Sequence, residues 1–286
     1  MERNLLDLHD DYHIGLLDRR EFLNRLALVA GGNTAAYALI PWLENNDLFA
    51  ETIPKDDSRI ASNDIRYQGA SGDLRASLVL PKGAKKIPGV VVIHEAFGLT
   101  PHIKDVARRL GMEGFMAIAP DAFTSLGKLP KDLQEARAMI QQLDSENTIQ
   151  DYVAAAKYLQ THPRSNGNVG VVGFCWGGGM ANQVAVKWPD LKAAVPFYGG
   201  QPATEDVPGI KASLLLHYAG DDDRVNAGIP TFEEALKKAS IDYTLYMYEG
   251  AQHGFHNDTL MERYNQEAAR LAWKRTIDFF KKKLSP

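Results

Sequence analysis

From about residue 74 onward, short apolar runs rich in β-branched residues alternate with stretches of helical periodicity. The clearest run is Val90-Val91-Val92-Ile93-His94, which lies between a Pro-Gly pair and Gly98. An apolar run without polar alternation is typical of a parallel strand that is covered on both faces. On the same grounds we predict strands at 74–80 (at a sheet edge), 90–94, 115–119, 169–174, 193–197, 213–217 and 243–248.

Between these strands the apolar residues recur every three or four positions, which is the period of an amphipathic helix. We predict helices at 104–111, 132–143, 148–159, 177–187, 230–239 and 262–283. Strands that alternate with helices in this way form a mostly parallel central sheet with helices on both faces, so the predicted fold class is α/β. Such sheets place their chemistry at the carboxyl ends of the strands, and candidate residues are therefore sought in the loops that follow them.

The first 60 residues follow a different pattern, and we assign 1–60 to an N-terminal segment that precedes a domain at 61–286. Arg19-Arg20 stands before a weakly apolar stretch at 26–40, and together they resemble a twin-arginine export signal. The nearest cleavage candidate is 48–50. The alternative is an amphipathic helix at 19–28 that packs on the domain. The first interpretation predicts a periplasmic protein, and the second predicts a cytoplasmic one.

The composition of the chain argues against several classes of binding partner. The chain has 286 residues, of which 45% are apolar and 24% are charged, as in most folded domains. Its formal net charge of −4 argues against binding to nucleic acid or to an anionic lipid surface. No run of about eighteen apolar residues occurs, so stable membrane insertion is not expected. The single cysteine excludes an internal disulfide and a thiolate-rich metal site, and we expect no metal and no cofactor.

That cysteine lies in the most informative motif of the chain, Gly173-Phe174-Cys175-Trp176-Gly177, between a predicted strand and a predicted helix. The pattern matches the nucleophile elbow G-x-S-x-G, with sulfur in place of the serine oxygen. A helix that begins directly after the cysteine is expected to favour its thiolate form. The alternatives are a buried structural cysteine and a glycine-rich loop that cradles phosphate. The phosphate loop is disfavoured because the segment matches neither G-x-G-x-x-G nor G-x-x-x-x-G-K-[ST].

An elbow nucleophile needs an acid and then a histidine, in that order along the chain. The acid is sought in the run of three aspartates at 221–223, where the spacing selects Asp222 first and Asp223 second. The histidine is sought after the last predicted strand, where His253 is the first choice and His256 is its rival. A metal site at this histidine pair is disfavoured because the segment is not expected to be helical.

The loop after the strand at 90–94 supplies further candidates. His94-Glu95-Ala96-Phe97-Gly98 begins like the zinc motif H-E-x-x-H, but Gly98 stands where that motif has its second histidine. In an α/β-hydrolase, this loop and the residue after the nucleophile each contribute a backbone N–H to the oxyanion hole. We therefore predict that the N–H groups of Ala96 and Trp176 are the oxyanion donors.

Four features together resemble the dienelactone hydrolase family of the α/β-hydrolase superfamily over about residues 65–284: H-E-x-F-G at Glu95, G-F-C-W-G-G at Cys175, the aspartate Asp222, and H-G-F at His253. The resemblance implies an α/β-hydrolase fold in which Cys175 is the nucleophile and His253 is the general base and then the acid. It implies that Asp222 orients the histidine. It also implies that Glu95 contacts the resting thiol and helps to transfer it to the histidine.

The chain departs from that family in two places. Members that open dienelactones carry an arginine shortly after the histidine, which grips the substrate carboxylate, whereas this chain has Gly-Phe-His-Asn at 254–257. Trp176 is also bulkier than the usual aliphatic residue. The candidate substrate contacts are Arg137, on the predicted helix at 132–143, together with Phe97 and Phe255.

The predicted function is hydrolysis of a small activated ester or a lactone through a thioester intermediate, with that small molecule as the partner. The alternative is a non-catalytic binding protein built on a hydrolase scaffold. A redox-sensing thiol is disfavoured because the chain has no second cysteine to resolve an oxidised sulfur.

Overall fold

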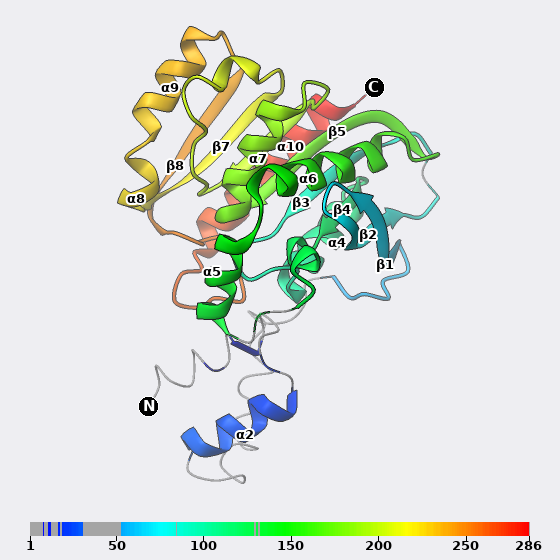
Figure 1. Cartoon of the computed structure of the whole chain (residues 1–286), viewed down its shortest axis with the longest axis vertical. Coiled ribbons are helices and arrows are strands. Elements are labelled where there is room, and N and C mark those ends of the chain that lie inside the picture. The colour runs from blue at the N-terminus through cyan, green and yellow to red at the C-terminus, as the bar shows by residue number, and fades with distance from the viewer. Residues whose placement is uncertain are drawn as a thin grey trace.

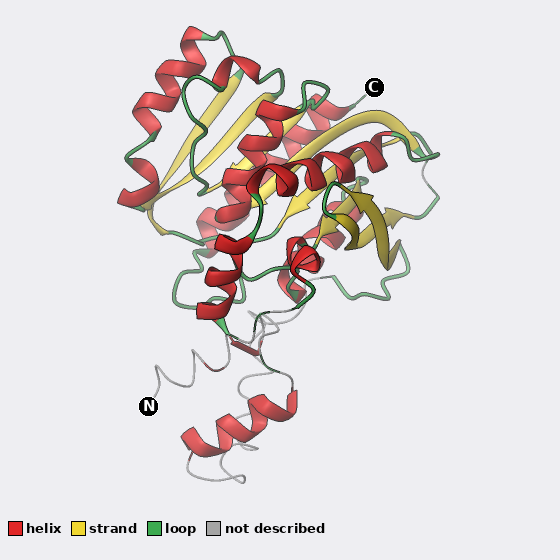
Figure 2. Ribbon diagram, viewed as in Figure 1, coloured by secondary structure: helices red, strands yellow, loops and turns green. Residues whose placement is uncertain are grey.

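A computed structural model of the protein shows one eight-stranded sheet between two layers of helices (Figures 1 and 2). The structure describes residues 8, 11–12, 17, 19–30, 53–83, 85–128, 130 and 132–285. The strands are β1 Ile60–Gly69, β2 Gly72–Pro81, β3 Ile87–Ile93, β4 Met116–Pro120, β5 Ser165–Phe174, β6 Ala193–Phe197, β7 Ser213–Asp221 and β8 Tyr243–Gln252. The helices around them are α4 Pro101–Met112, α5 Leu133–Gln142, α6 Ser145–Gln160, α7 Trp176–Lys187, α8 Asp223–Asn226, α9 Ile229–Lys238 and α10 Gln266–Leu284.

Both faces of the sheet are buried, as the continuous apolar runs predict. Along β3, Val91 and Ile93 point to one face while Val90 and Val92 point to the other, and all four are completely buried. Residues of α5, α6, α7 and α9 pack on the first face, and residues of α4 and α10 pack on the second (Figure 1). The predicted α/β class is therefore confirmed.

The strand order is β1-β2-β4-β3-β5-β6-β7-β8. Neighbours from β4 to β8 run parallel, while β1 and β2 form an antiparallel hairpin at one end of the sheet. The prediction that the strand at 74–80 lies at an edge is wrong, because β2 lies between β1 and β4. Strand β1 was not predicted, because only Ile60 and Tyr67 of its ten residues are buried and the strand has no sustained apolar alternation.

Side-chain caps fix where two helices next to the candidate site begin. The Thr100 hydroxyl accepts a backbone N–H of the first turn of α4, and Pro101 occupies a position whose N–H would have no partner in the helix. The Asn265 side chain accepts a backbone N–H of the first turn of α10 in the same way. The loops at 94–100 and 253–265 therefore enter their helices at defined positions.

The N-terminal segment contains the helix α2 Arg19–Ala30, which covers the predicted range 19–28. Its residues Phe22 and Leu26 form an apolar cluster with Leu8 and Leu17. Residues 31–40 of the weakly apolar stretch and the cleavage candidate at 48–50 lie outside the described residues. Among the residues that are described, no helix has both the length and the apolar character needed to cross a membrane.

Two adjacent glycines after β6, Gly199 and Gly200, differ in how closely they approach the backbone of α7. A Cβ at Gly199 would lie 2.3 Å from the carbonyl carbon of Gly178, whereas a Cβ at Gly200 would have nothing within 4 Å. We expect Gly199→Ala to lower the free energy of unfolding by roughly 1–3 kcal/mol, the usual range for overpacking. Gly200→Ala should change it by less than about 0.5 kcal/mol. Urea denaturation measures both values, and equal effects would contradict this packing.

Candidate active site

Cys175 connects β5 to α7. Its φ of 56° and ψ of −117° place the backbone in a region that L-residues rarely adopt, as a nucleophile elbow requires. The turn is possible because a glycine precedes it: a Cβ at Gly173 would lie 1.9 Å from the carbonyl oxygen of Gly177. The Cys175 N–H donates to the Phe197 carbonyl at 3.0 Å, which ties the turn to the end of β6. The sulfur is therefore held at the carboxyl edge of the sheet.

Side chains from two other loops meet this sulfur. The Nε2 atom of His253 lies 3.0 Å from the Sγ atom of Cys175, and the Nδ1 atom of the same ring lies 2.5 Å from Oδ2 of Asp222. Because a carboxylate only accepts hydrogen bonds, Nδ1 carries the ring proton and the lone pair of Nε2 faces the thiol. The Val225 N–H donates to the other oxygen of Asp222 at 3.4 Å and helps to hold the carboxylate. In this arrangement the imidazole can accept a proton from Cys175.

The rival residues have different surroundings. Asp223 is exposed in α8, whereas Asp222 is buried beside the imidazole. The ring of His256 is buried in the core, 4.9 Å from that of Phe174, and this burial holds its pKa well below the usual value. Among the described residues, no three His, Cys, Asp or Glu side chains are arranged to hold a metal ion.

Glu95 follows β3 and is 4% exposed. Its Oε2 atom accepts a hydrogen bond from the Asn257 side chain at 2.5 Å. The Asn257 oxygen accepts from the N–H and the hydroxyl of Thr259, at 3.0 and 2.6 Å, so the amide must present its NH₂ group to the carboxyl group. Burial raises the pKa of Glu95, although nearby donors and cations offset part of that rise. Glu95 is thus a buried carboxyl group held by a neutral amide.

The same burial keeps Cys175 in its thiol form. Burial raises the pKa of Cys175 to about 11, and the negative charge of Glu95 acts in the same direction. The Trp176 N–H, the charge of Arg224 and the Ala96 N–H lower this pKa only in part. The start of α7 favours the thiolate through the Trp176 N–H, as expected, but desolvation disfavours the charged form more strongly, so the resting protein carries a thiol.

Two backbone N–H groups face the sulfur, and both belong to predicted oxyanion donors. The N–H groups of Trp176 and Ala96 lie close enough to the Cys175 side chain to lower the pKa of its thiol. The first comes from the start of α7 and the second from the loop after β3. A negatively charged oxygen on a carbon bound to this sulfur would lie within reach of both groups.

The predicted substrate contacts do not share one environment. Phe97 is partly exposed in the loop after β3, and Arg137 is exposed on α5. Phe255 is completely buried, and its ring centroid lies 5.3 Å from that of Tyr198 and 5.0 Å from that of Tyr248. The prediction that Phe255 contacts substrate is therefore wrong for this structure, in which its ring is part of the core.

No catalytic role could be predicted from the sequence for three residues that lie at the site. Asn257 holds Glu95, Arg224 lowers the pKa of Cys175, and the His94 side chain bonds to the Glu95 backbone. The available signal for Asn257 was its position, four residues after His253. No sequence pattern indicated that an amide at this position would turn toward a carboxyl group more than a hundred residues away in the chain.

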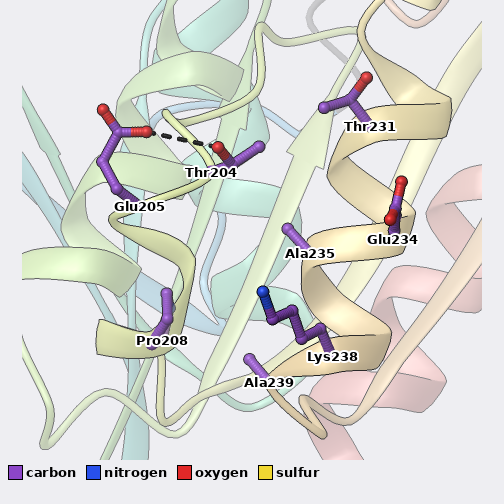
Figure 3. Close-up of a pocket in the computed structure, with 8 residues that line it drawn as sticks. All are labelled: Thr204, Glu205, Pro208, Thr231, Glu234, Ala235, Lys238 and Ala239. Atoms are coloured by element: carbon purple, nitrogen blue, oxygen red, sulfur yellow. Dashed lines mark hydrogen bonds between the residues drawn. The ribbon is translucent and has the colours of Figure 1, made fainter.

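A groove of about 640 Å³ lies between the segment at 204–208 and α9 (Figure 3). Its lining residues are Thr204, Glu205, Pro208, Thr231, Glu234, Ala235, Lys238 and Ala239. The Thr204 hydroxyl donates to Glu205 at 3.3 Å on one wall, and Lys238 extends from α9 on the other. The groove contains none of the candidate catalytic residues and is distinct from the candidate active site.

Comparison with known proteins gives the family that the chain matches. The model of the dienelactone hydrolase family matches residues 74–284. A protein of Saccharolobus solfataricus named "Putative carboxymethylenebutenolidase" is 32% identical over 257 residues, which are 77% of this chain and 98% of that protein. The crystal structure of a dienelactone hydrolase-like promiscuous phosphotriesterase from metagenomic libraries is 25% identical, with a TM-score of 0.73 over 80% of this chain and 100% of the other.

The contribution of Glu95 to the thiol pKa can be measured without a substrate. Glu95→Gln removes the charge and keeps the shape, so we expect it to lower the pKa of Cys175 by about one unit. The pH dependence of alkylation by iodoacetamide measures this shift. Asp223→Asn, which removes an exposed carboxylate, is the control and should leave the pH profile unchanged. An unchanged pKa of Cys175 in Glu95→Gln would show that the charge of Glu95 does not contribute to the raised pKa of the thiol.

Proposed function

The chain belongs to the dienelactone hydrolase family, and on that premise we propose that it hydrolyses small activated esters or lactones with Cys175 as the nucleophile. The observation that carries the proposal is the continuous contact from the sulfur through His253 to Asp222, at 3.0 and 2.5 Å. The name of the relative that is 32% identical, a carboxymethylenebutenolidase, favours a lactone as the substrate.

In the first half of the reaction, Nε2 of His253 takes the thiol proton as the sulfur attacks the carbonyl carbon of the substrate. The carbonyl electron pair moves onto oxygen, and the N–H groups of Ala96 and Trp176 stabilise the oxyanion. Collapse of this intermediate breaks the bond to the alcohol oxygen, which receives the proton from His253. In a lactone the alcohol stays tethered and the ring opens. A thioester on Cys175 remains.

In the second half, water replaces the alcohol. His253 accepts a proton from the water as its oxygen adds to the thioester carbonyl, and the same two N–H groups stabilise the second oxyanion. The sulfur then leaves with the bonding pair and regains a proton from His253. Asp222 stabilises the imidazolium in both halves and keeps the ring in the tautomer that the reaction needs. The acid product departs and the thiol is restored.

The high pKa of the resting thiol restricts the substrates that fit this mechanism. Proton transfer must accompany attack, because little thiolate exists before the substrate arrives. Glu95 disfavours the free thiolate through its charge, and we assign it the role of keeping the sulfur protonated until then. A carbonyl with a good leaving group, or one in a strained ring, accepts the sulfur most readily. Activated esters and lactones are therefore preferred to amides.

The second candidate, a non-catalytic binding protein on a hydrolase scaffold, fits the site less well. A strained backbone at φ 56° carries a conformational cost, and strain of this kind persists where the surrounding structure enforces it. A binding protein would need neither that turn nor an imidazole placed against the sulfur. The hydrolase proposal uses both.

The role of the sulfur is tested by Cys175→Ala. We expect kcat/KM for p-nitrophenyl acetate and for a small lactone to fall by at least about 10³-fold, because no nucleophile remains. Acid quench during steady-state turnover, followed by mass spectrometry, should find the wild-type chain with one added acyl group and the variant with none. Undiminished activity in Cys175→Ala would overturn the assignment.

The choice between two neighbouring aspartates is tested by a matched pair of variants. Asp222→Asn should lower kcat by about 10³–10⁴-fold, because an amide can donate to Nδ1 and so favours the wrong tautomer of His253. Asp223→Asn should leave kcat within about twofold, since its side chain is exposed. Steady-state kinetics on the same ester measures both, and the reverse order of effects would assign the acid to Asp223.

A further inference from the structure

The two N–H groups that face the sulfur are held in different ways. The Cys175 carbonyl accepts from the N–H groups of Gly178 and Gly179, at 3.0 and 3.2 Å, because it begins the hydrogen-bond ladder of α7. In a trans peptide the C=O and the N–H point in opposite directions, so the helix turns the Trp176 N–H toward the sulfur. Ala96 lies in a loop, where no helix provides such an orientation.

The side chain of His94 provides the orientation of the Ala96 N–H instead. Its Nδ1 atom lies 2.6 Å from the Glu95 carbonyl oxygen, and that carbonyl shares its peptide with the Ala96 N–H. The Nε2 atom lies 3.2 Å from the Ala122 N–H, which can only donate. Nε2 is therefore the acceptor, and the ring proton lies on Nδ1 and is donated to Glu95. The Gly98 N–H reaches the same carbonyl at 3.3 Å, a longer contact.

The environment of the His94 ring keeps it neutral and fixed in orientation. It is completely buried, and burial lowers its pKa, so the ring is neutral near pH 7 with one donor and one acceptor. It also stacks on Trp176, with ring centroids 5.3 Å apart and an angle of 25° between the planes. The imidazole of His94 thus contacts the peptide that carries the Ala96 N–H and the side chain of Trp176. Its hydrogen bond from the Ala122 N–H holds the ring in place.

We propose that His94 is a positioning residue for the oxyanion hole, because its bond to the Glu95 carbonyl turns the Ala96 N–H toward Cys175. The catalytic consequence rests on the proposed function. The orientation of the N–H toward the sulfur does not, and it can be tested in the absence of any substrate.

Two variants separate the two hydrogen bonds of the ring. In His94→Asn the amide nitrogen takes the place of Nδ1 and can donate to Glu95, while in His94→Gln the amide oxygen takes the place of Nε2 and can accept from Ala122. We expect His94→Asn to keep kcat within about threefold of the wild-type value. His94→Gln should lower kcat by about ten- to a hundredfold with little change in KM, which is part of the cost of losing an oxyanion donor.

The control is a second buried imidazole. His217 is completely buried and bonds to Thr276 and Tyr248, at 3.1 and 2.9 Å, with no contact to the Glu95 peptide. His217→Asn should lower the unfolding temperature and leave kcat close to the wild-type value. If His94→Asn and His94→Gln lose activity equally, in proportion to their unfolding temperatures, His94 only stabilises the core and the proposal is overturned.

Alkylation by iodoacetamide supplies the readout without substrate. The Ala96 N–H lowers the pKa of Cys175, so an N–H turned away from the sulfur should raise that pKa and slow alkylation at a fixed pH. We expect this change in His94→Gln and not in His94→Asn. If the two variants differ in this way but the wild-type protein hydrolyses no ester or lactone, the positioning role is supported and the proposed function fails. Identical alkylation in both variants, alongside wild-type hydrolysis, would overturn the positioning role alone.

Discussion

The positive-φ turn at Cys175 holds the sulfur within hydrogen-bond distance of His253. A backbone in this conformation costs about 1–3 kcal/mol and persists only where its surroundings enforce it. The hydrogen bond to Phe197 on one side and the start of α7 on the other provide that enforcement. In return, the turn places a side chain and the following N–H on the same side of the peptide. The sulfur and the N–H of Trp176, the proposed oxyanion donor, are thus positioned by a single local structure.

Burial determines the charges that this arrangement can hold. Glu95 is buried and Cys175 is half-buried, and desolvation raises the pKa of each. A neutral amide, Asn257, holds the carboxyl group of Glu95. Proton transfer to His253 creates a positive charge in the proposed reaction, and the buried side chain of Asp222 is positioned to stabilise it.

Much of this could be predicted from sequence because it is local or fixed in chain order. The buried strands show continuous apolar runs, and the elbow glycines must be glycines because a Cβ would collide with backbone. Asp222 and His253 then follow β7 and β8, in the chain order that a nucleophile elbow predicts. Strand β1 could not be predicted, since a half-exposed edge needs no apolar pattern. The buried position of Phe255 and the contacts of His94 and Asn257 depend on which distant segments pack beside them, and neither composition nor spacing encodes that.

The protonated state of the sulfur has a consequence for the survival of the protein. With a pKa of about 11, only about one molecule in ten thousand carries a thiolate at pH 7. Peroxides and other soluble electrophiles react with thiolates rather than with thiols, so the resting sulfur is a poor target for them. In the proposed mechanism, a carbonyl compound bound between the two N–H groups activates the sulfur, because His253 accepts the thiol proton as the new bond forms. The sulfur of Cys175 is thus reactive toward molecules that bind between the two N–H groups, and its oxidation or alkylation by other molecules is slow.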